Sequence, residues 1–188
     1  LYENNLFLTT LNEFLGVQSR LPISVSPKTF PCPMTEGIVF DHVSFQYPHE
    51  ERVAIRDFTF SIRAGEHVAF VGANGAGKTT LVKLLCRLYD PSNGRIMIDQ
   101  TDLRDYPIAE VRGAVSGIFQ DFVKFQLSAK DNIALGVRTS GADPFAIVQA
   151  AKQAGIHETI EHLPNGYESL LGKLFDGGHE LSIGEWQK

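Results

Sequence analysis

Several features that would narrow the function of this chain are scarce in its sequence. Only two cysteines occur among its 188 residues, and neither they nor the six scattered histidines have the spacing of a metal site. A disulfide framework and a zinc centre are therefore not expected, and the cysteine usage indicates a reducing compartment. The first residues lack both the basic and the apolar region of a signal peptide.

Positive charge and long apolar runs are scarce as well. Lys and Arg number 17 against 22 Asp and Glu, and the net charge of −5 argues against a basic nucleic-acid-binding face. No run of about 18 apolar residues appears, so no membrane span is predicted within these residues. The chain does have an ordinary hydrophobic fraction of 43% and a length suited to about one domain.

The first 35 residues differ in pattern from the rest. Apolar residues between Leu6 and Leu15 have helical spacing, and Gly16 is expected to end that helix. Four prolines between residues 22 and 33 forbid regular structure, so this stretch is predicted to be a semi-extended linker.

Strand and helix patterns alternate from about residue 36 onward. Apolar alternation and short apolar runs predict strands over 37–47 (with an irregularity near His42), 58–63, 67–72, 95–99 and 115–120. The run at 67–72 is continuously apolar, as in a buried parallel strand. Helices are predicted over 78–89, 128–135 and 143–155, the last with Pro144 in its first turn. The sequence is therefore expected to fold in the α/β class.

The strongest motif is GANGAGKTT, from Gly72 to Thr80, which fits G-x-x-x-x-G-K-[ST] between a predicted strand and a predicted helix. Glycines at 75 and 77 let the backbone curl until its N–H groups face an anion, and the following helix adds its N-terminal dipole. Lys78 can reach the β- and γ-phosphates, and the Thr79 hydroxyl can ligate Mg²⁺. A simple glycine-rich turn does not require Lys-Thr after its last glycine, so the motif predicts a nucleotide site.

Three further features are weak when each is taken alone. Tyr47 can stack on a purine, although a tyrosine at a strand end more often packs in the core or at a sheet edge. The Gln120 carbonyl can ligate Mg²⁺ or hold a water, although an isolated glutamine is normally a surface residue. Ser182 and Glu185 have the spacing of a capping box, which begins a helix with or without a further role.

In their order and spacing these features resemble the nucleotide-binding domain of ABC transporters. Tyr47 matches the adenine-stacking aromatic of that family, Gly72–Thr80 its Walker A loop and Gln120 its Q-loop glutamine. The segment from Leu181 to Glu185 matches its signature motif, usually Leu-Ser-Gly-Gly-Gln. The resemblance implies a P-loop NTPase fold of ABC type, with a parallel core sheet, an antiparallel β subdomain, and a helical subdomain over about 121–188.

The resemblance also implies the residues of the site and its cofactors, ATP and Mg²⁺. Lys78 and Gln120 are expected to be catalytic, and Thr79 and Gln120 to ligate the metal. The expected nucleotide contacts are Tyr47, Gly72, Asn74, Gly75, Ala76, Gly77, Lys78, Thr79, Thr80, Gln120, Ser182 and Gly184.

Three positions depart from, or only superficially match, the family pattern. Ile183 stands where the signature usually has its first Gly, and Glu185 where it has Gln. Because a carboxylate near a phosphate repels it, Glu185 is predicted to cap its own helix instead. Asp99 superficially resembles the family's Walker B aspartate, but it precedes Gln120 and is expected to end an antiparallel or connecting strand.

The first residues resemble the exporter type, in which membrane and ATPase domains share one polypeptide. Residues 1–19 match the cytoplasmic tail of the last membrane helix, 20–35 the linker, and 36–188 the ATP-binding domain. This implies an ATP-driven exporter on the cytoplasmic face of the cell membrane, paired head to tail with an identical or homologous subunit and without a nucleic-acid partner. Phe122, Phe125 and Leu127 are expected either to face the membrane domain or to be buried in the helical subdomain.

In the family, the Walker B aspartate, the catalytic glutamate and the switch histidine follow the signature motif. No residues follow Lys188 to supply them, so the chain is interpreted as a partial domain that ends just after the signature. The intact protein is expected to hydrolyse ATP, and residues 1–188 alone are expected to be inactive.

Two alternative functions fit the sequence less well. A soluble ABC-type ATPase acting on DNA or ribosomes usually carries two cassettes or a long coiled-coil insert, and the sequence suggests neither. A P-loop kinase or GTPase would leave Tyr47, Gln120 and the 181–185 motif unexplained.

Overall fold

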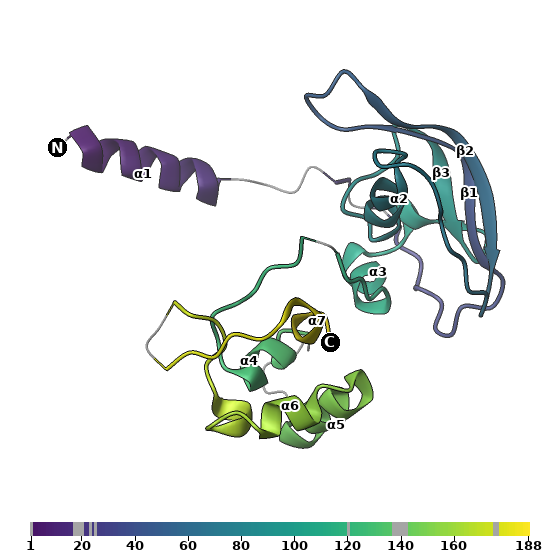
Figure 1. Cartoon of the computed structure of the whole chain (residues 1–188). Helices are drawn as coiled ribbons and strands as arrows, with labels where there is room; N and C mark the ends of the chain where they lie inside the picture. The colour runs from purple at the N-terminus through teal and green to yellow at the C-terminus, as the bar shows by residue number, and fades with distance from the viewer. Residues whose placement is uncertain are drawn as a thin grey trace. The chain divides into compact units, whose positions relative to one another are not determined.

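The computed structural model describes residues 2–16, 21–22, 24, 26–119, 121–136, 143–174 and 177–188. They belong to two compact units, Leu1–Ser116 and Gly117–Lys188 (Figure 1). Each unit has its own cluster of buried apolar side chains, so each holds its elements together through a separate core.

The first unit begins with helix α1 (Tyr2–Leu15), which ends next to Gly16 as predicted. The apolar side chains of Leu8, Leu11 and Phe14 are exposed on it. Among the residues that the structure describes, no helix combines the length and the apolar character needed to cross a membrane.

A four-stranded antiparallel sheet forms the centre of the first unit, in the order β2-β1-β3-β4. Its strands are β1 (Gly37–Gln46), β2 (Val53–Arg63), β3 (Asn93–Ile98) and β4 (Thr101–Asp102). The predicted strands at 37–47, 58–63 and 95–99 are confirmed, and β2 begins earlier than expected. The predicted irregularity is a bulge: the pairing register shifts after Phe40, and His42 has a φ of 50°.

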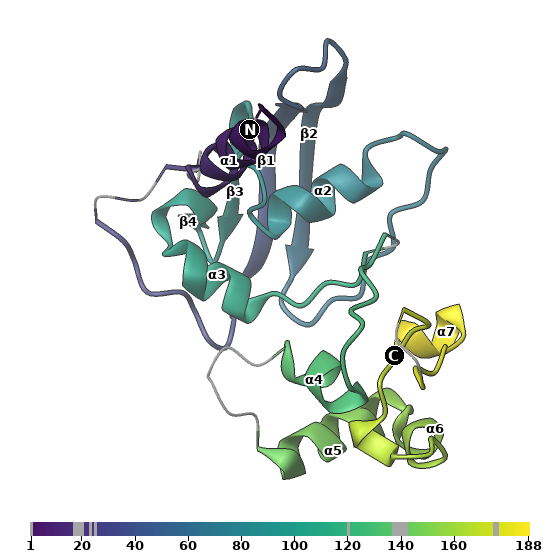
Figure 2. The same cartoon turned by 90° about the vertical axis from the view of Figure 1, so that its left-hand side faces the viewer.

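Helix α2 (Lys78–Leu85) lies across one face of this sheet (Figure 2). Leu81 and Leu84 are buried against the sheet, together with Phe40, Val43 and Ile96. The helix ends before the predicted residue 89. Its continuation is prevented because Arg87 has a φ of 48°, a left-handed conformation that a right-handed helix does not accommodate.

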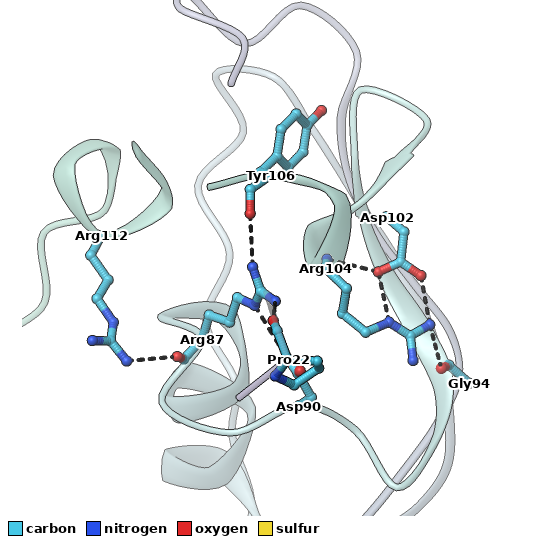
Figure 3. Close-up of polar contacts among 8 residues, drawn as sticks. All are labelled: Pro22, Arg87, Asp90, Gly94, Asp102, Arg104, Tyr106 and Arg112. Atoms are coloured by element: carbon cyan, nitrogen blue, oxygen red, sulfur yellow. Dashed lines mark hydrogen bonds and ion pairs between the residues drawn. The ribbon is translucent and has the colours of Figure 1, made fainter. Parts of the chain in front are cut away.

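The buried guanidinium of Arg87 joins the end of α2 to the linker (Figure 3). The side chain is only 1% exposed, and it donates hydrogen bonds to the carbonyls of Tyr106 at 2.8 Å and Pro22 at 3.0 Å. It also pairs with Asp90 at 3.2 Å. The described linker residues have no regular secondary structure, as predicted, yet the linker is held on the unit by such bonds.

Asp99 supplies the second attachment of the linker. Its carboxylate accepts backbone N–H groups from Thr35 at 2.8 Å, Glu36 at 2.8 Å and Gly37 at 3.0 Å. These bonds, chiefly those from Gly37 and Thr35, lower the pKa of Asp99 to about 2. Asp99 therefore follows an antiparallel strand, as predicted, and fixes the start of β1.

Two strand predictions are wrong. Residues 67–72 and the described part of 115–120 form no strand, and Val71 and Ile118 are 94% and 75% exposed. Both segments have strand-forming composition, but a parallel strand also needs a hydrogen-bonded neighbour. The described residues provide none for either segment. The mixed α/β class and the antiparallel sheet are confirmed, whereas no parallel core sheet forms among the described residues.

A short 3₁₀ turn η1 (Leu103–Asp105) and helix α3 (Ile108–Ala114) complete the first unit. The second unit contains α4 (Ala129–Ala134), α5 (Pro144–Ala154), α6 (His157–Glu161), η2 (Gly166–Glu168) and α7 (Ile183–Trp186). The predicted helices at 128–135 and 143–155 are confirmed. Ser128 and Asp143 cap their N-termini, and Gly155, with a φ of 69°, ends α5.

Candidate functional site

The glycine-rich loop between Gly72 and Lys78 has the curled backbone that its sequence predicts. Gly75 and Gly77 have φ values of 79° and 89°, in the left-handed region that favours glycine. A side chain at Gly77 would also collide with Ile55 and with the carbonyl of Ala54 on β2. Glycine is therefore required at this position by both conformation and space.

Gly77 is also the N-cap residue of α2, and it provides no capping side chain. The first turn of α2 contains no acidic residue either. The first N–H groups of a helix have no partner within the helix, and its dipole favours negative charge there. The end of the loop thus offers donors to an anion, without an acidic side chain in the first turn to compete for them.

The Lys78 side chain folds back over the loop. Its ammonium donates hydrogen bonds to the carbonyls of Gly72 at 2.7 Å and Ala73 at 2.8 Å. The carbonyls hold the charge at the loop, where phosphate oxygens can replace them as acceptors. Thr79 is exposed in the first turn of α2, which leaves its hydroxyl accessible to a cation, whereas Thr80 is buried.

Tyr47 lies beside α2. Its hydroxyl is 3.0 Å from the Thr80 hydroxyl, and its ring packs edge-to-face on Phe45 and Tyr89. The Lys83 ammonium lies 5.8 Å from the ring centroid. The ring is half-buried, so it takes part in an aromatic cluster and is also placed next to the phosphate loop.

Arg52 was missed by the sequence analysis. It lies in the turn between β1 and β2, and its guanidinium donates to the Gly75 carbonyl at 3.4 Å. An arginine in a turn is by itself no signal of a site, because such residues are common at exposed positions. Its relation to the loop depends on how β1 and β2 pair. Asn74 and Ala76 are exposed in the loop itself.

The 181–185 motif begins helix α7 with a complete capping box. The Ser182 hydroxyl accepts the Glu185 N–H at 3.3 Å, and the Glu185 carboxylate accepts the Ser182 N–H at 2.8 Å. The prediction that Glu185 caps its own helix is confirmed. The bonds from Ser182 hold the pKa of the Glu185 carboxyl below its usual range. Gly184 is exposed.

Comparison with known proteins decides the family. The family model described as "ABC transporter" matches residues 55–188. The chain belongs to the ABC transporter family. Two relatives from Bacillus subtilis (strain 168) are the "Uncharacterized ABC transporter ATP-binding protein YfiB" and the "Putative multidrug export ATP-binding/permease protein YgaD". YfiB is 43% identical over 80% of this chain and 26% of its own length, and YgaD 40% identical over 81% and 25%.

A solved structure agrees with this assignment. The structure described as "a bacterial Atm1-family ABC exporter with ATP bound" superposes with a TM-score of 0.79 at 31% identity, over 98% of this chain and 31% of that one. This ABC transporter chain therefore spans about a quarter of the length of the curated relatives it matches.

The ABC transporter motifs fall into the two units. Tyr47 and the Walker A loop come together in the first unit, and Ser182 and Gly184 in the second. Gln120 lies outside the described residues. Phe125 and Leu127, expected to be either buried or turned to a membrane domain, are partly exposed, and Phe122 is half-buried.

Proposed function

We propose that this chain is the ATP-binding part of an ABC exporter, which couples ATP binding and hydrolysis to transport across a membrane. The observation that carries the proposal is the phosphate loop: Gly77 caps α2 in a left-handed conformation without a competing side chain, and Lys78 is held above the loop. The likeness to YgaD, named a putative multidrug export protein, and to the structure of an Atm1-family ABC exporter supports the transport direction.

In this proposal each described residue has a separate task. The phosphates accept hydrogen bonds from the backbone of residues 72–80, which include Asn74 and Ala76. Lys78 leaves the carbonyls of Gly72 and Ala73 for the β- and γ-phosphates, because a charge-assisted bond to an anion is stronger than one to a neutral carbonyl. Tyr47 offers its ring to the adenine.

Thr79 and Gln120 would hold Mg²⁺. An exposed hydroxyl in the first turn of α2 fits an oxygen-preferring cation. When bound, Mg²⁺ would neutralise part of the negative charge on the phosphates. Lys78 contributes a fixed positive charge beside it, and Gln120 is proposed as the second catalytic residue.

The proposed partners are a second ABC subunit, arranged head to tail, and a membrane domain of the same polypeptide. Ser182 and Gly184 would face the γ-phosphate held by the other subunit. Residues 1–19 would continue a membrane helix, 20–35 link it to the ATPase domain, and 36–188 form part of that domain, with its helical part over about 121–188. In this arrangement the domain would lie on the cytoplasmic face of the membrane.

Hydrolysis is proposed for the intact protein. Within residues 1–188 no segment after the signature matches the Walker B aspartate, the catalytic glutamate or the switch histidine. We therefore expect residues 1–188 by themselves to bind MgATP and to turn it over far more slowly than the intact protein does.

Nucleotide titration tests the proposal. Lys78→Met should weaken MgATP binding by about 10- to 100-fold, the loss expected for a charged hydrogen-bonding partner. Lys152→Met, at an exposed position on α5, is the matched control and should bind as wild type does. Titration with GTP tests the kinase or GTPase alternative. Equal affinity of wild type and Lys78→Met for MgATP would reject the phosphate site.

A further inference from the structure

Three segments of the second unit lie side by side ahead of α7. The Leu171 N–H donates to the Leu127 carbonyl at 2.9 Å, and the His179 N–H donates to the Leu170 carbonyl at 2.8 Å. The Gly172 N–H returns a bond to the His179 carbonyl at 2.7 Å. This backbone ladder connects the segment around residues 124–127 to His179, directly before Glu180 and the signature.

Lys124 adds a side-chain connection to the same place. Its ammonium lies 2.8 Å from a Glu180 carboxylate oxygen and 5.7 Å from the centroid of the Trp186 ring. One charged group therefore contacts the residue before the signature motif and the last residue of α7. The side chains of Lys124 and Glu180 are each 36% exposed, so solvent and salt weaken their attraction only in part.

One carboxylate directly precedes the signature motif and another ends it, and the structure accounts for each. Glu185 is turned back onto the Ser182 N–H. Glu180, two residues before Ser182, is paired with Lys124, and the Lys124 hydrogen bond is the main cause of its lowered pKa. Glu180 therefore stays ionised at neutral pH, and removing Lys124 would leave a carboxylate without this ion pair two residues before Ser182.

We propose that Lys124 is a positioning residue, which neutralises Glu180 and anchors α7 so that Ser182 and Gly184 can receive a phosphate. The proposal rests on the function proposed above, in which these two residues meet the γ-phosphate on the other subunit. The charge of Lys124 is what the signature requires.

Lys124→Met tests this because it keeps an aliphatic stem and removes the charge. In the full-length protein we expect kcat/KM for ATP to fall about two- to tenfold, the order expected when one carboxylate near a phosphate is left uncompensated. Glu180→Gln should stay close to wild type. The double variant should recover most of the loss, because removing both charges removes the repulsion.

Lys130→Met is the matched control. Lys130 pairs with Glu168 at the same 2.8 Å in the same unit, and neither residue of this ion pair belongs to α7, so its loss should leave kcat/KM unchanged. An unchanged kcat/KM in Lys124→Met, or no recovery in the double variant, would overturn the proposal. Wild type without ATP hydrolysis would instead reject the proposed function, and this inference with it.

Trp186 provides a readout that does not require turnover. It is the only tryptophan among the 188 residues, so its emission in this chain reports on α7 alone. Lys124→Met should change its emission intensity, because the ammonium leaves the ring, and Lys130→Met should not. Identical emission in wild type and Lys124→Met would show that Lys124 does not hold α7.

Discussion

The hydroxyl of Tyr47 lies 3.0 Å from the hydroxyl of Thr80. This hydrogen bond connects the residue after β1 to α2, the helix that follows the phosphate loop. The bond joins two residues that are far apart in the sequence. It fixes the distance between the aromatic ring proposed to meet adenine and the loop proposed to hold the phosphates of the same nucleotide.

Tyr47 should therefore have two separable effects. Tyr47→Ala removes the ring and is expected to weaken ATP binding about two- to tenfold, as for the loss of one aromatic stacking contact. Tyr47→Phe keeps the ring and loses only the bond to Thr80, with a stability cost of about 1 kcal/mol and little change in affinity. Nucleotide titration and urea unfolding separate the two. Unchanged affinity in Tyr47→Ala would remove the stacking role.

Gly77 offers a test of the loop geometry. Gly77→Ala must adopt a φ of 89° and place its methyl group against Ile55 and Ala54, so we expect the free energy of unfolding to fall by at least about 2 kcal/mol. Gly155→Ala is the control, since Gly155 has a φ of 69° with open space around the missing side chain. Gly155→Ala should lower the free energy of unfolding by only about 1 kcal/mol, the strain of a left-handed conformation alone. Equal costs, measured by urea unfolding, would contradict the steric argument.

Asp99 predicts a dependence of stability on pH. Its pKa is lowered in the folded state from 3.8 to about 2, because its carboxylate accepts backbone N–H groups of residues 35–37. The lowered pKa means that this stabilisation is fully present above pH 3.8 and is lost as the pH falls toward 2. Asp99→Asn should be less stable at pH 7 and should lack this part of the acid transition. Parallel acid-unfolding curves for both proteins would contradict it.

Removing the Arg87 side chain should cause one of the larger decreases in the free energy of unfolding. Arg87→Met leaves Asp90 without its ion pair and the Pro22 and Tyr106 carbonyls without this donor. We therefore expect the free energy of unfolding to fall by about 3–5 kcal/mol. Arg104→Met is the control, because the Arg104–Asp102 pair is considerably more exposed, and it should cost about 1 kcal/mol or less. Thermal or urea unfolding of the two variants checks the contrast. A similar cost for both would show that burial of Arg87 does not matter.

Local chemistry explains which parts of the structure were predictable from the sequence. The capping box at Ser182, the first-turn Pro144 and the glycine at 155 each act within one turn of helix, so short patterns suffice to identify them. The Walker A loop is local in the same sense: its glycines, its lysine and the start of α2 are contiguous.

The errors and omissions concern long-range pairing. Residues 67–72 have the composition of a buried strand, but composition does not say which segment will pair with them. The reach of Arg52 to Gly75 depends on the β1–β2 turn, and the burial of Arg87 depends on the path of the linker. Likewise, Asp99 was correctly separated from a catalytic aspartate by its order in the chain. Its hydrogen bonds from the backbone of residues 35–37 could not be predicted, because they depend on how distant segments pack.

The capping box of α7 has a consequence for binding. The Ser182 hydroxyl accepts the Glu185 N–H, and the Glu185 carboxylate accepts the Ser182 N–H, so the helix end is already ordered by its own side chains. A phosphate arriving there would meet a receptor assembled in advance, and little conformational entropy would be lost at the moment of contact.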